Sequence, residues 1–194
     1  MIRFFDIVLS GFGLVCLSPF LLIIYICIRC ESKGGGFYAQ ERIGKDGVPF
    51  KLYKFRSMRV GADRGSLITI GDRDPRVTNV GHFLRSYKFD ELPQLWNVLK
   101  GDMSIVGPRP EVEKYTRLYT DEQRKVLSVR PGVTDWASIK YIDENTILGE
   151  AEDPDKAYVE QIMPDKIKYN MKWIQKQTVY EYFRIILHTF FRIP

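Results

Sequence analysis

The chain has 194 residues, of which 45% are hydrophobic and 27% are charged, close to the averages of globular proteins. These proportions exclude a disordered or low-complexity chain, and the length suffices for one domain with a core, alone or with an appendage. The charges are unevenly placed, because the 22 residues from Ile7 to Ile28 carry none. The amino-terminal segment therefore needs an explanation of its own.

This uncharged segment is long enough to cross a membrane. As one α-helix it would span about 33 Å, and the hydrocarbon core of a bilayer is about 30 Å thick. Pro19, preceded by Ser18, divides it into two arms of about half that length and removes one backbone hydrogen bond. The Ser18 hydroxyl could satisfy the carbonyl that is freed. Two alternatives stay open: a re-entrant hairpin with both ends on one face of the membrane, and a kinked helix that spans it.

Most charges lie after this segment. Residues 31–142 contain 20 Lys and Arg against 14 Asp and Glu, which suggests an anionic partner such as phospholipid, nucleotide or nucleic acid. Nucleic acid is disfavoured because neither a recognition helix nor an aromatic RNA-binding motif accompanies the charge. Residues 143–155 contain six acids and no base. We expect these acidic residues to form a solvated loop rather than a metal site.

The stretch from Phe50 to Arg59 mixes aromatic residues and cations without clean alternation. We interpret it as a short strand or hairpin that places Lys54 and Arg56 near an anion. A solvated basic surface is the alternative.

The clearest local pattern is an amphipathic helix. Apolar residues recur at its spacing, namely Leu92, Leu95, Trp96 and Leu99. Pro93 suits a first helical turn, so the helix is expected to begin near Asp90 and Glu91 and to end at Gly101.

Two adjacent carboxylates, Asp90 and Glu91, therefore lie at a helix N-terminus. The helix dipole favours an ionised Asp there, and free backbone N–H groups suit phosphate oxygens. An ionised Asp beside a phosphate is what nucleophilic attack on phosphorus needs, with Arg85, Lys88 or Mg²⁺ screening the like charges. The simpler alternative makes Asp90 an N-cap and Glu91 a first-turn acid.

Prolines on both sides restrict the backbone at Arg109. A guanidinium held in advance suits bidentate binding of a phosphate or carboxylate. Pairing with a structural acid such as Glu111 is the alternative.

The stretch RSYKFDELPQLWNVLKGDMSIVGPRP, residues 85–110, closely resembles the bacterial sugar transferase family, the monotopic phosphoglycosyl transferases. The resemblance extends upstream through residues 53–58 to Ser18-Pro19, and downstream to Arg130-Pro131-Gly132-Val133-Thr134. It covers most of the chain, which is similar to the small members that consist of the catalytic part.

The resemblance implies transfer of a phospho-sugar from a UDP-sugar to undecaprenyl (polyprenol) phosphate, the first membrane step of surface glycan assembly. It assigns Asp90 as the nucleophile that releases UMP, through a covalent phospho-sugar intermediate. Glu91 would assist, and the two carboxylates would hold Mg²⁺. The resemblance implies phosphate binding or structural clamping for the basic residues Arg56, Arg85 and Arg109, with Arg85 the strongest match. Lys54 and Arg130 are further candidates for binding phosphate or substrate.

The resemblance also associates Ser18-Pro19 with a re-entrant helix at the inner bacterial membrane, with the rest of the chain on its cytoplasmic face. The chain differs from the family pattern at Asp135 and Ser138, where many members have Gly and Gln. Because this region is expected to contact the nucleotide-sugar, the identity of the donor sugar stays open.

Near the carboxyl end, apolar residues again follow helical spacing: Val179, Tyr182, Phe183, Ile186, Leu187 and Phe190. The opposite face is mostly basic, so we expect a helix at the lipid interface, with a core-facing helix as the alternative.

We therefore predict a mainly helical α+β fold with little β-structure and interfacial amphipathic helices. Residues 1–30 would form the membrane anchor and residues 31–194 the catalytic domain. Phospholipid, UDP-sugar and undecaprenyl phosphate are the expected partners, and homodimer formation stays open. The rival interpretation is a non-catalytic module that binds anionic lipid through its basic surface.

Overall fold

The computed structural model describes residues 1–62 and 74–192. In chain order, the elements are α1 (Ile2–Glu31), β1 (Phe37–Ile43), η1 (Lys45–Gly47), β2 (Pro49–Phe55), α2 (Asn79–Ser86), η3 (Phe89–Glu91), α3 (Gln94–Lys100), β3 (Ser104–Val106), α4 (Glu113–Thr116), α5 (Asp121–Arg124), η4 (Lys125–Ser128), β4 (Gly132–Thr134), α6 (Trp136–Lys140), α7 (Glu144–Gly149), α8 (Pro154–Ala157), η5 (Tyr158–Ile162), α9 (Met163–Gln175) and α10 (Val179–Arg192). Helices dominate and the strands are short, which confirms the mainly helical α+β prediction.

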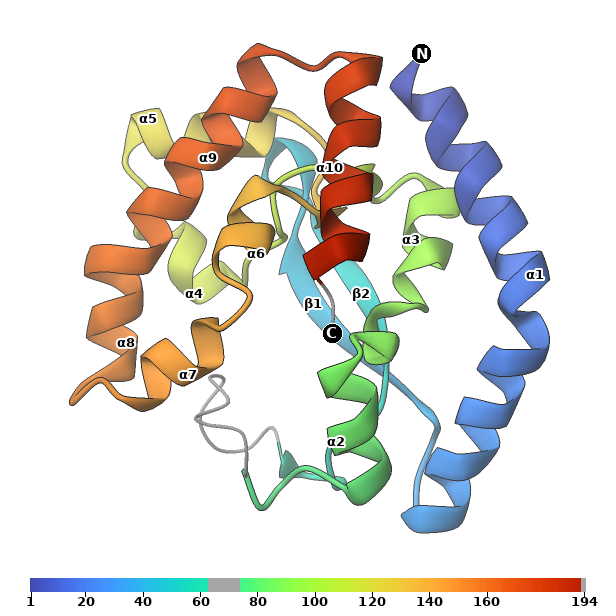
Figure 1. Cartoon of the computed structure of the whole chain (residues 1–194). Coiled ribbons are helices and arrows are strands. Elements are labelled where there is room, and N and C mark those ends of the chain that lie inside the picture. Colours follow the sequence, from blue (N-terminus) through green and yellow to red (C-terminus); the bar gives the residue numbers. More distant parts are fainter. Residues whose placement is uncertain (63–73, 193–194) are drawn as a thin grey trace.

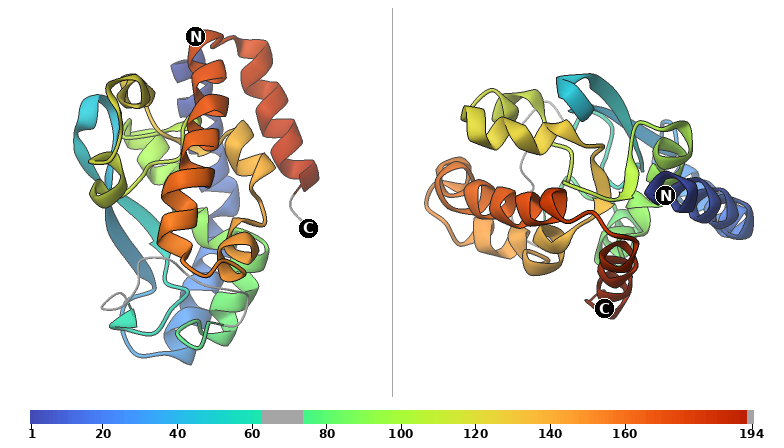
Figure 2. Two further views of the ribbon diagram at one scale, coloured as in Figure 1. Left: turned by 90° about the vertical axis from the view of Figure 1, so that its left-hand side faces the viewer. Right: turned by 90° about the horizontal axis from the view of Figure 1, so that it is seen from above.

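Figure 1 shows α1 along one flank and α8 and α9 along the opposite flank, and the view from above in Figure 2 agrees. Strands β1 and β2 form an antiparallel hairpin, with Phe37 opposite Phe55 and Ile43 opposite Pro49. This hairpin confirms the strand predicted within Phe50–Arg59.

Strands β3 and β4 pair in parallel, with Ser104 opposite Gly132. Their backbones approach so closely that a Cβ atom on Gly132 would lie 2.1 Å from the Gly107 nitrogen. Only glycine fits there. This contact fixes the start of the chain segment that carries Arg109.

Helix α1 runs without interruption through Pro19, although its axis bends midway (Figure 1). Proline at position 19 removes the N–H that would bond the carbonyl of Val15, four residues earlier. The Ser18 hydroxyl donates to that carbonyl at 2.8 Å. The expected role of Ser18 is thus confirmed, while the predicted break takes the form of a bend within one helix rather than two antiparallel arms.

The first turns of α1 are anchored to the rest of the molecule by charged side chains. Arg3 donates to the carbonyls of Val98 and Leu99 at 2.7 and 3.0 Å, at the end of α3. Asp6 is 2% exposed, and its Oδ1 accepts from three donors at 2.9 Å: Ser104 Oγ, Ile105 N and Tyr182 Oη. One buried carboxylate therefore joins α1, β3 and α10.

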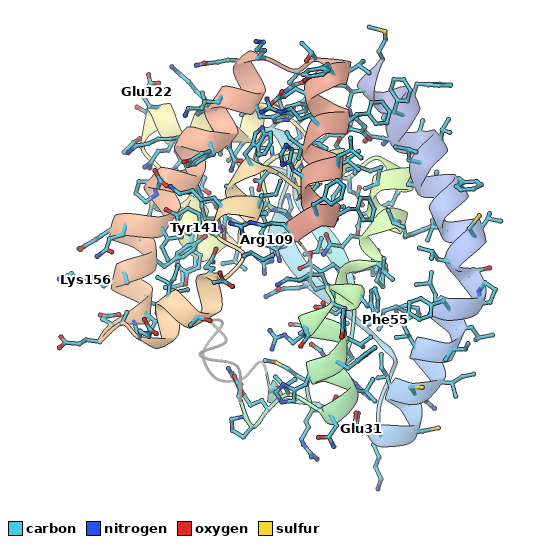
Figure 3. All side chains as sticks on the ribbon, in the orientation of Figure 1. Glu31, Phe55, Arg109, Glu122, Tyr141 and Lys156 are labelled. Atoms are coloured by element: carbon cyan, nitrogen blue, oxygen red, sulfur yellow. The ribbon has the colours of Figure 1, made fainter. Side chains whose placement is uncertain are left out.

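The other end of α1 is anchored as well, beside α2 (Figure 3). The Glu31 carboxylate accepts from the backbone N–H groups of Asn79 and Val80 at 2.6 and 2.9 Å. A carboxylate is favourable at the N-terminus of a helix, so Glu31 stabilises α2.

The middle of α1 is largely uncovered. Only 11% of its most apolar 18-residue window is buried. The exposed large apolar residues of the helix are Phe4, Ile7, Val8, Phe12, Val15, Leu22, Ile23 and Ile26. By length and composition this helix could cross a membrane.

Helix α10 confirms the predicted carboxyl-terminal helix and divides its apolar residues between core and surface. Tyr182 and Ile185 are fully buried beside α1 and β3, as the core-facing alternative requires. Leu187, Phe190 and Phe191 at its end are exposed. The interfacial role stays a prediction for this end.

Residues 143–155 are solvated as expected, because five of the six acids are exposed, but the segment is not a loop, since it contains α7 and the start of α8. Two of its acids have partners from outside the segment. Glu144 pairs with the buried Lys166 at 2.9 Å, and Asp155 accepts from Lys114 and from the Tyr115 hydroxyl.

Candidate active site

The two candidate carboxylates lie where a tight turn connects α2 to α3. Lys88 adopts a left-handed conformation, with φ of 57°, which is uncommon for a residue other than glycine. The short helix η3, which contains Asp90 and Glu91, follows at once, and Leu92 and Pro93 continue the helical path into α3. Gly101 ends α3 in the left-handed region, as predicted.

The carboxylate of Asp90 is not used for capping. Neither η3 nor α3 has a side-chain cap, so the N-cap interpretation of Asp90 is wrong. Asp90 is nevertheless only 6% exposed. A buried carboxylate without a structural task is a candidate for chemistry.

Glu91, in contrast, is held between two cations. Its Oε1 accepts from Lys54 Nζ at 2.8 Å and from Arg109 Nη2 at 2.5 Å, and its Oε2 accepts from Arg109 Nη1 at 3.3 Å. The side chains of Lys54 and Glu91 are only 19% and 13% exposed. Lys54 is therefore no part of a solvated basic surface, and Arg109 pairs with Glu91 rather than with Glu111.

These contacts give the adjacent carboxyls opposite properties. Burial raises the pKa of Asp90, Glu91 raises it further, and the positive charge of Lys54 opposes both. Burial alone would also raise the pKa of Glu91, but Arg109 and Lys54 hold it well below its ordinary value. Burial lowers the pKa of Lys54, partly offset by Glu91. Glu91 is thus firmly ionised, whereas the cations near Asp90 do not fully offset the effect of burial on its pKa.

Of the other predicted phosphate ligands, Arg85 is the best placed. It lies in the last turn of α2, and its charge, with that of Lys88, lowers the pKa of Asp90. Lys88 and Tyr87 are exposed on the turn that precedes Asp90. This side of the carboxylate is therefore basic.

Arg56 and Arg130 have other contacts. Arg56 is 8% exposed and donates to the carbonyls of Ser32 and Lys33 at 2.8 and 2.9 Å, just beyond α1. Arg130 donates to the Gly101 carbonyl at 2.9 Å, at the end of α3. Both bonds hold chain segments together, which agrees with structural clamping for the buried Arg56. Arg130 is exposed, and its contact with phosphate or substrate stays a prediction.

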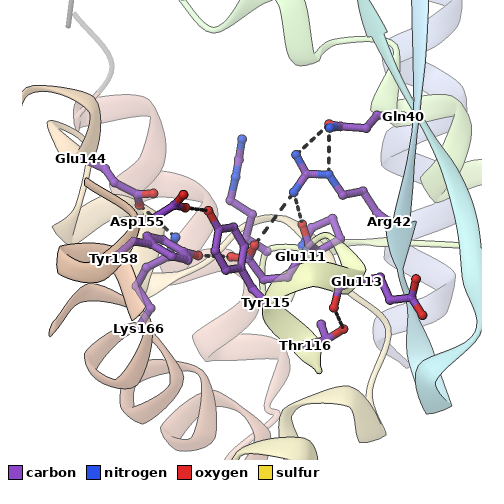
Figure 4. Close-up of polar contacts among 12 residues, drawn as sticks. Gln40, Arg42, Glu111, Glu113, Tyr115, Thr116, Glu144, Asp155, Tyr158 and Lys166 are labelled. Carbon is purple, nitrogen blue, oxygen red and sulfur yellow. Dashed lines mark hydrogen bonds and ion pairs between the residues drawn. The ribbon is translucent and has the colours of Figure 1, made fainter. Parts of the chain in front are cut away.

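A polar network surrounds Glu111, two residues after Arg109 in the chain (Figure 4). The Tyr158 hydroxyl donates to Glu111, and Arg42 donates to the Pro110 carbonyl at 3.0 Å. The Ile43 N–H donates to the Glu111 carbonyl at 2.9 Å. The segment that presents Arg109 is thus fixed from β1 and η5.

The predicted Mg²⁺ ligands fit only in part. Within residues 1–62 and 74–192, no group of three or more His, Cys, Asp or Glu is placed to hold a metal. Glu91 already binds two cations, which disfavours it as a ligand. Asp90 fits, because Mg²⁺ at phosphate sites takes one or two carboxylates and completes its shell with phosphate oxygens and water.

Asp135 lies in the region that is expected to contact the nucleotide-sugar, and its own side chain is fully buried. Its Oδ1 accepts from Ser138 N at 2.5 Å and its Oδ2 from Arg109 N at 3.3 Å. The sequence could indicate the cap of α6, because an Asp stands at the N-cap position of a short helix. It gives no signal for the bond from Arg109 N to Asp135.

The chain is similar to known undecaprenyl-phosphate sugar-phosphate transferases. The chain is 37% identical over 193 residues to a UDP-glucose:undecaprenyl-phosphate glucose-1-phosphate transferase of Klebsiella pneumoniae, covering 98% of this chain and 39% of that protein. It is 37% identical to the transferase of the same name from Escherichia coli K12, covering 96% of this chain and 39% of that protein. It is 35% identical to the UDP-N-acetylgalactosamine-undecaprenyl-phosphate N-acetylgalactosaminephosphotransferase of Aeromonas hydrophila, covering 97% and 44%.

The chain thus spans about two fifths of the length of these relatives. The family model for the bacterial sugar transferases matches residues 1–193. The chain belongs to the bacterial sugar transferase family.

Proposed function

We propose that this protein is a phosphoglycosyl transferase that moves a phospho-sugar from a UDP-sugar to undecaprenyl phosphate through a covalent intermediate on Asp90. The observation that carries the proposal is the difference in partners between two adjacent buried carboxylates. The negative charge of Glu91 is balanced by ion pairs with Lys54 and Arg109, whereas Asp90 takes no capping role and lies within the electrostatic influence of Arg85 and Lys88.

The first half-reaction makes one bond and breaks one. An oxygen of ionised Asp90 attacks the β-phosphorus of the UDP-sugar, and the bond from that phosphorus to the bridging oxygen breaks. UMP leaves with the electron pair. In the second half-reaction, a phosphate oxygen of undecaprenyl phosphate attacks the same phosphorus and displaces the Asp90 carboxylate, which yields undecaprenyl-diphosphate-sugar.

The surrounding residues make these steps feasible. The Arg109–Glu91–Lys54 cluster keeps Glu91 ionised without adding an uncompensated negative charge beside the nucleophile. Arg85 and Lys88 favour the ionised form of Asp90 and attract the donor diphosphate. The rigid turn at Lys88 fixes the nucleophile before substrate arrives.

We further propose that Asp90 contributes the protein ligand for Mg²⁺, with the donor phosphates completing its coordination. Mg²⁺ would neutralise charge on the donor diphosphate, including the charge that UMP takes with it when it leaves. Glu91 supports Asp90 by position rather than by metal binding, since its oxygens already accept from Lys54 and Arg109.

We propose that α1 dips into the cytoplasmic face of the bacterial inner membrane around its bend and keeps both of its ends on that face. The exposed apolar side chains of α1 support insertion, and the polar anchors at its two ends support a common side. Arg3 and Asp6 at one end and Glu31 at the other all bind the same domain. The soluble donor and the lipid-borne acceptor phosphate would then meet at Asp90.

A panel of UDP-sugars, each incubated with the protein, Mg²⁺ and undecaprenyl phosphate, tests the proposal by UMP release. We expect UMP with at least one donor and its loss in Asp90→Asn. Asp121→Asn, at an exposed position in the first turn of α5, is the matched control and should keep wild-type turnover. Lipid binding without UMP from any donor, or full turnover by Asp90→Asn, would refute the proposal and favour a lipid-binding module.

A further inference from the structure

The segment that carries Arg109 has an unusual backbone. Because residues 108 and 110 are both proline, Arg109 contributes the one N–H donor of these three residues. That N–H donates to Asp135 Oδ2 at 3.3 Å. The acceptor is therefore a carboxylate side chain, where a backbone carbonyl would usually serve.

Asp135 is well suited to hold this position. It is fully buried at the start of α6, and its second oxygen accepts from Ser138 N at 2.5 Å, which caps the helix. The preceding strand is fixed by the bonds from Gly107 N to the Thr134 carbonyl and from Gly132 N to the Pro108 carbonyl. Asp135 therefore connects a firmly held strand and helix directly to the Arg109 backbone.

The other end of Arg109 reaches the reaction centre. Its guanidinium donates twice to Glu91, the residue next to Asp90. A displacement of the Arg109 backbone would move the guanidinium, release Glu91 and change the charge beside Asp90. Direct contact between Asp135 and a substrate is excluded, since the side chain is completely covered.

From these contacts we infer that Asp135 is a positioning residue, which sets the Arg109 backbone and through it the Glu91 carboxylate beside Asp90. The inference rests on the proposed function, because its readout is phospho-sugar transfer. It assigns a task to a residue that differs from the glycine of many family members.

Two substitutions separate positioning from helix stability. Asp135→Asn retains an oxygen that can accept from Ser138 N, and Asn caps helices as well as Asp does. Its amide NH₂ then faces the Arg109 N–H, so the contact with Arg109 is lost. Asp135→Ala removes both bonds. Asp153→Ala is the matched control, because Asp153 caps α8 through Lys156 N at 3.0 Å and has no bond to the Arg109 segment.

We expect kcat for UMP release to fall about ten- to a hundredfold in Asp135→Asn, the loss typical of a misplaced catalytic group. KM for the UDP-sugar should change less than about threefold, because Asp135 does not touch substrate. The melting temperature of Asp135→Asn should fall no further than that of Asp153→Ala, and Asp153→Ala should keep its kcat.

The inference is overturned if Asp135→Asn keeps a kcat within about twofold of wild type, or if KM alone changes. It is also overturned if kcat falls only in proportion to unfolded protein, or if Asp135→Asn fails to fold, since Asp135 would then serve stability alone. A wild-type protein that releases no UMP from any donor instead refutes the proposed function, and the inference falls with it. An active wild type beside an equally active Asp135→Asn refutes the inference only.

Discussion

Removal of the Lys54 charge by Lys54→Met should lower the stability of the fold and raise the pKa of Asp90. The substitution keeps the apolar stem and deletes an ammonium 2.8 Å from Glu91 Oε1, and at an effective dielectric constant of about 20 such a pair attracts by about 6 kcal/mol. Dehydration of both groups offsets much of this, and Arg109 remains as the second partner of Glu91. We expect the free energy of unfolding to fall by about 2–3 kcal/mol, the value for a lost bond between buried charged groups.

The same substitution should also change the pH profile. Burial raises the pKa of Asp90 above its ordinary value of 3.8, and Lys54 is the foremost cation opposing that rise. Without Lys54 the pKa of Asp90 rises further, so less of the nucleophile is ionised at a given pH. The acid limb of UMP release against pH should move to higher pH.

Lys51→Met, on an exposed position of the same strand, is the control and should leave both the profile and the stability unchanged. The assay measures initial rates of UMP release between pH 5 and 9 with saturating donor, beside urea unfolding in detergent. An acid limb that stays in place, or moves to lower pH, would refute the electrostatic reasoning.

Three further predictions follow from the described contacts. Tyr182→Phe removes one of three donors to buried Asp6 and should lower the free energy of unfolding by about 1.5–3 kcal/mol. Tyr180→Phe, at an exposed position, should leave it unchanged. Equal free energies of unfolding for the two variants would contradict the role of Asp6 in holding α1 to β3 and α10. Because the pKa of Glu91 is depressed below 4.5, its charge stabilises the fold above that pH, and the benefit disappears as the pH falls through the folded pKa. Glu91→Gln should therefore flatten the acid-side decline of the melting temperature, and two identical declines would exclude this linkage. In a variant with its native cysteines replaced, Met1→Cys and Ser32→Cys should react with an impermeant maleimide from the same side of inner-membrane vesicles; labelling from opposite sides would show that α1 spans the bilayer.

The local parts of the fold could be predicted from the sequence. The helix ending at Gly101 and the helix from Val179 depend on spacing within a short stretch, and the strand over Pro49–Phe55 depends on local composition; each is present. The Ser18 bond to the Val15 carbonyl was predictable for the same reason, because donor and acceptor lie three residues apart.

The contacts that distinguish the site are not local. Glu91 meets Lys54 and Arg109, which are 37 and 18 residues away in the chain, and no periodicity reveals such pairs. Charge alone was also a poor guide to function. Arg56, for example, is a cation that could bind phosphate, but it is buried and donates to backbone carbonyls, because a guanidinium satisfies such acceptors as well as phosphate.

The acidic segment illustrates the same limit. A run of acids without bases indicates solvation, which is correct for five of its six acids, but it gives no sign that Lys166 and Tyr115 from distant elements bind Glu144 and Asp155. The network around Glu111 likewise depends on Tyr158, 47 residues further on.

Asp90 as the covalent nucleophile is the central claim, and mass spectrometry of the intact protein tests it most directly. The protein is incubated with the donor that releases UMP, in the absence of undecaprenyl phosphate, and is then digested to locate any adduct. We predict an added phospho-sugar mass on the peptide that contains Asp90, its absence in Asp90→Asn, and its disappearance when undecaprenyl phosphate is added. UMP release without an adduct on Asp90, or an adduct on another residue, would contradict the mechanism.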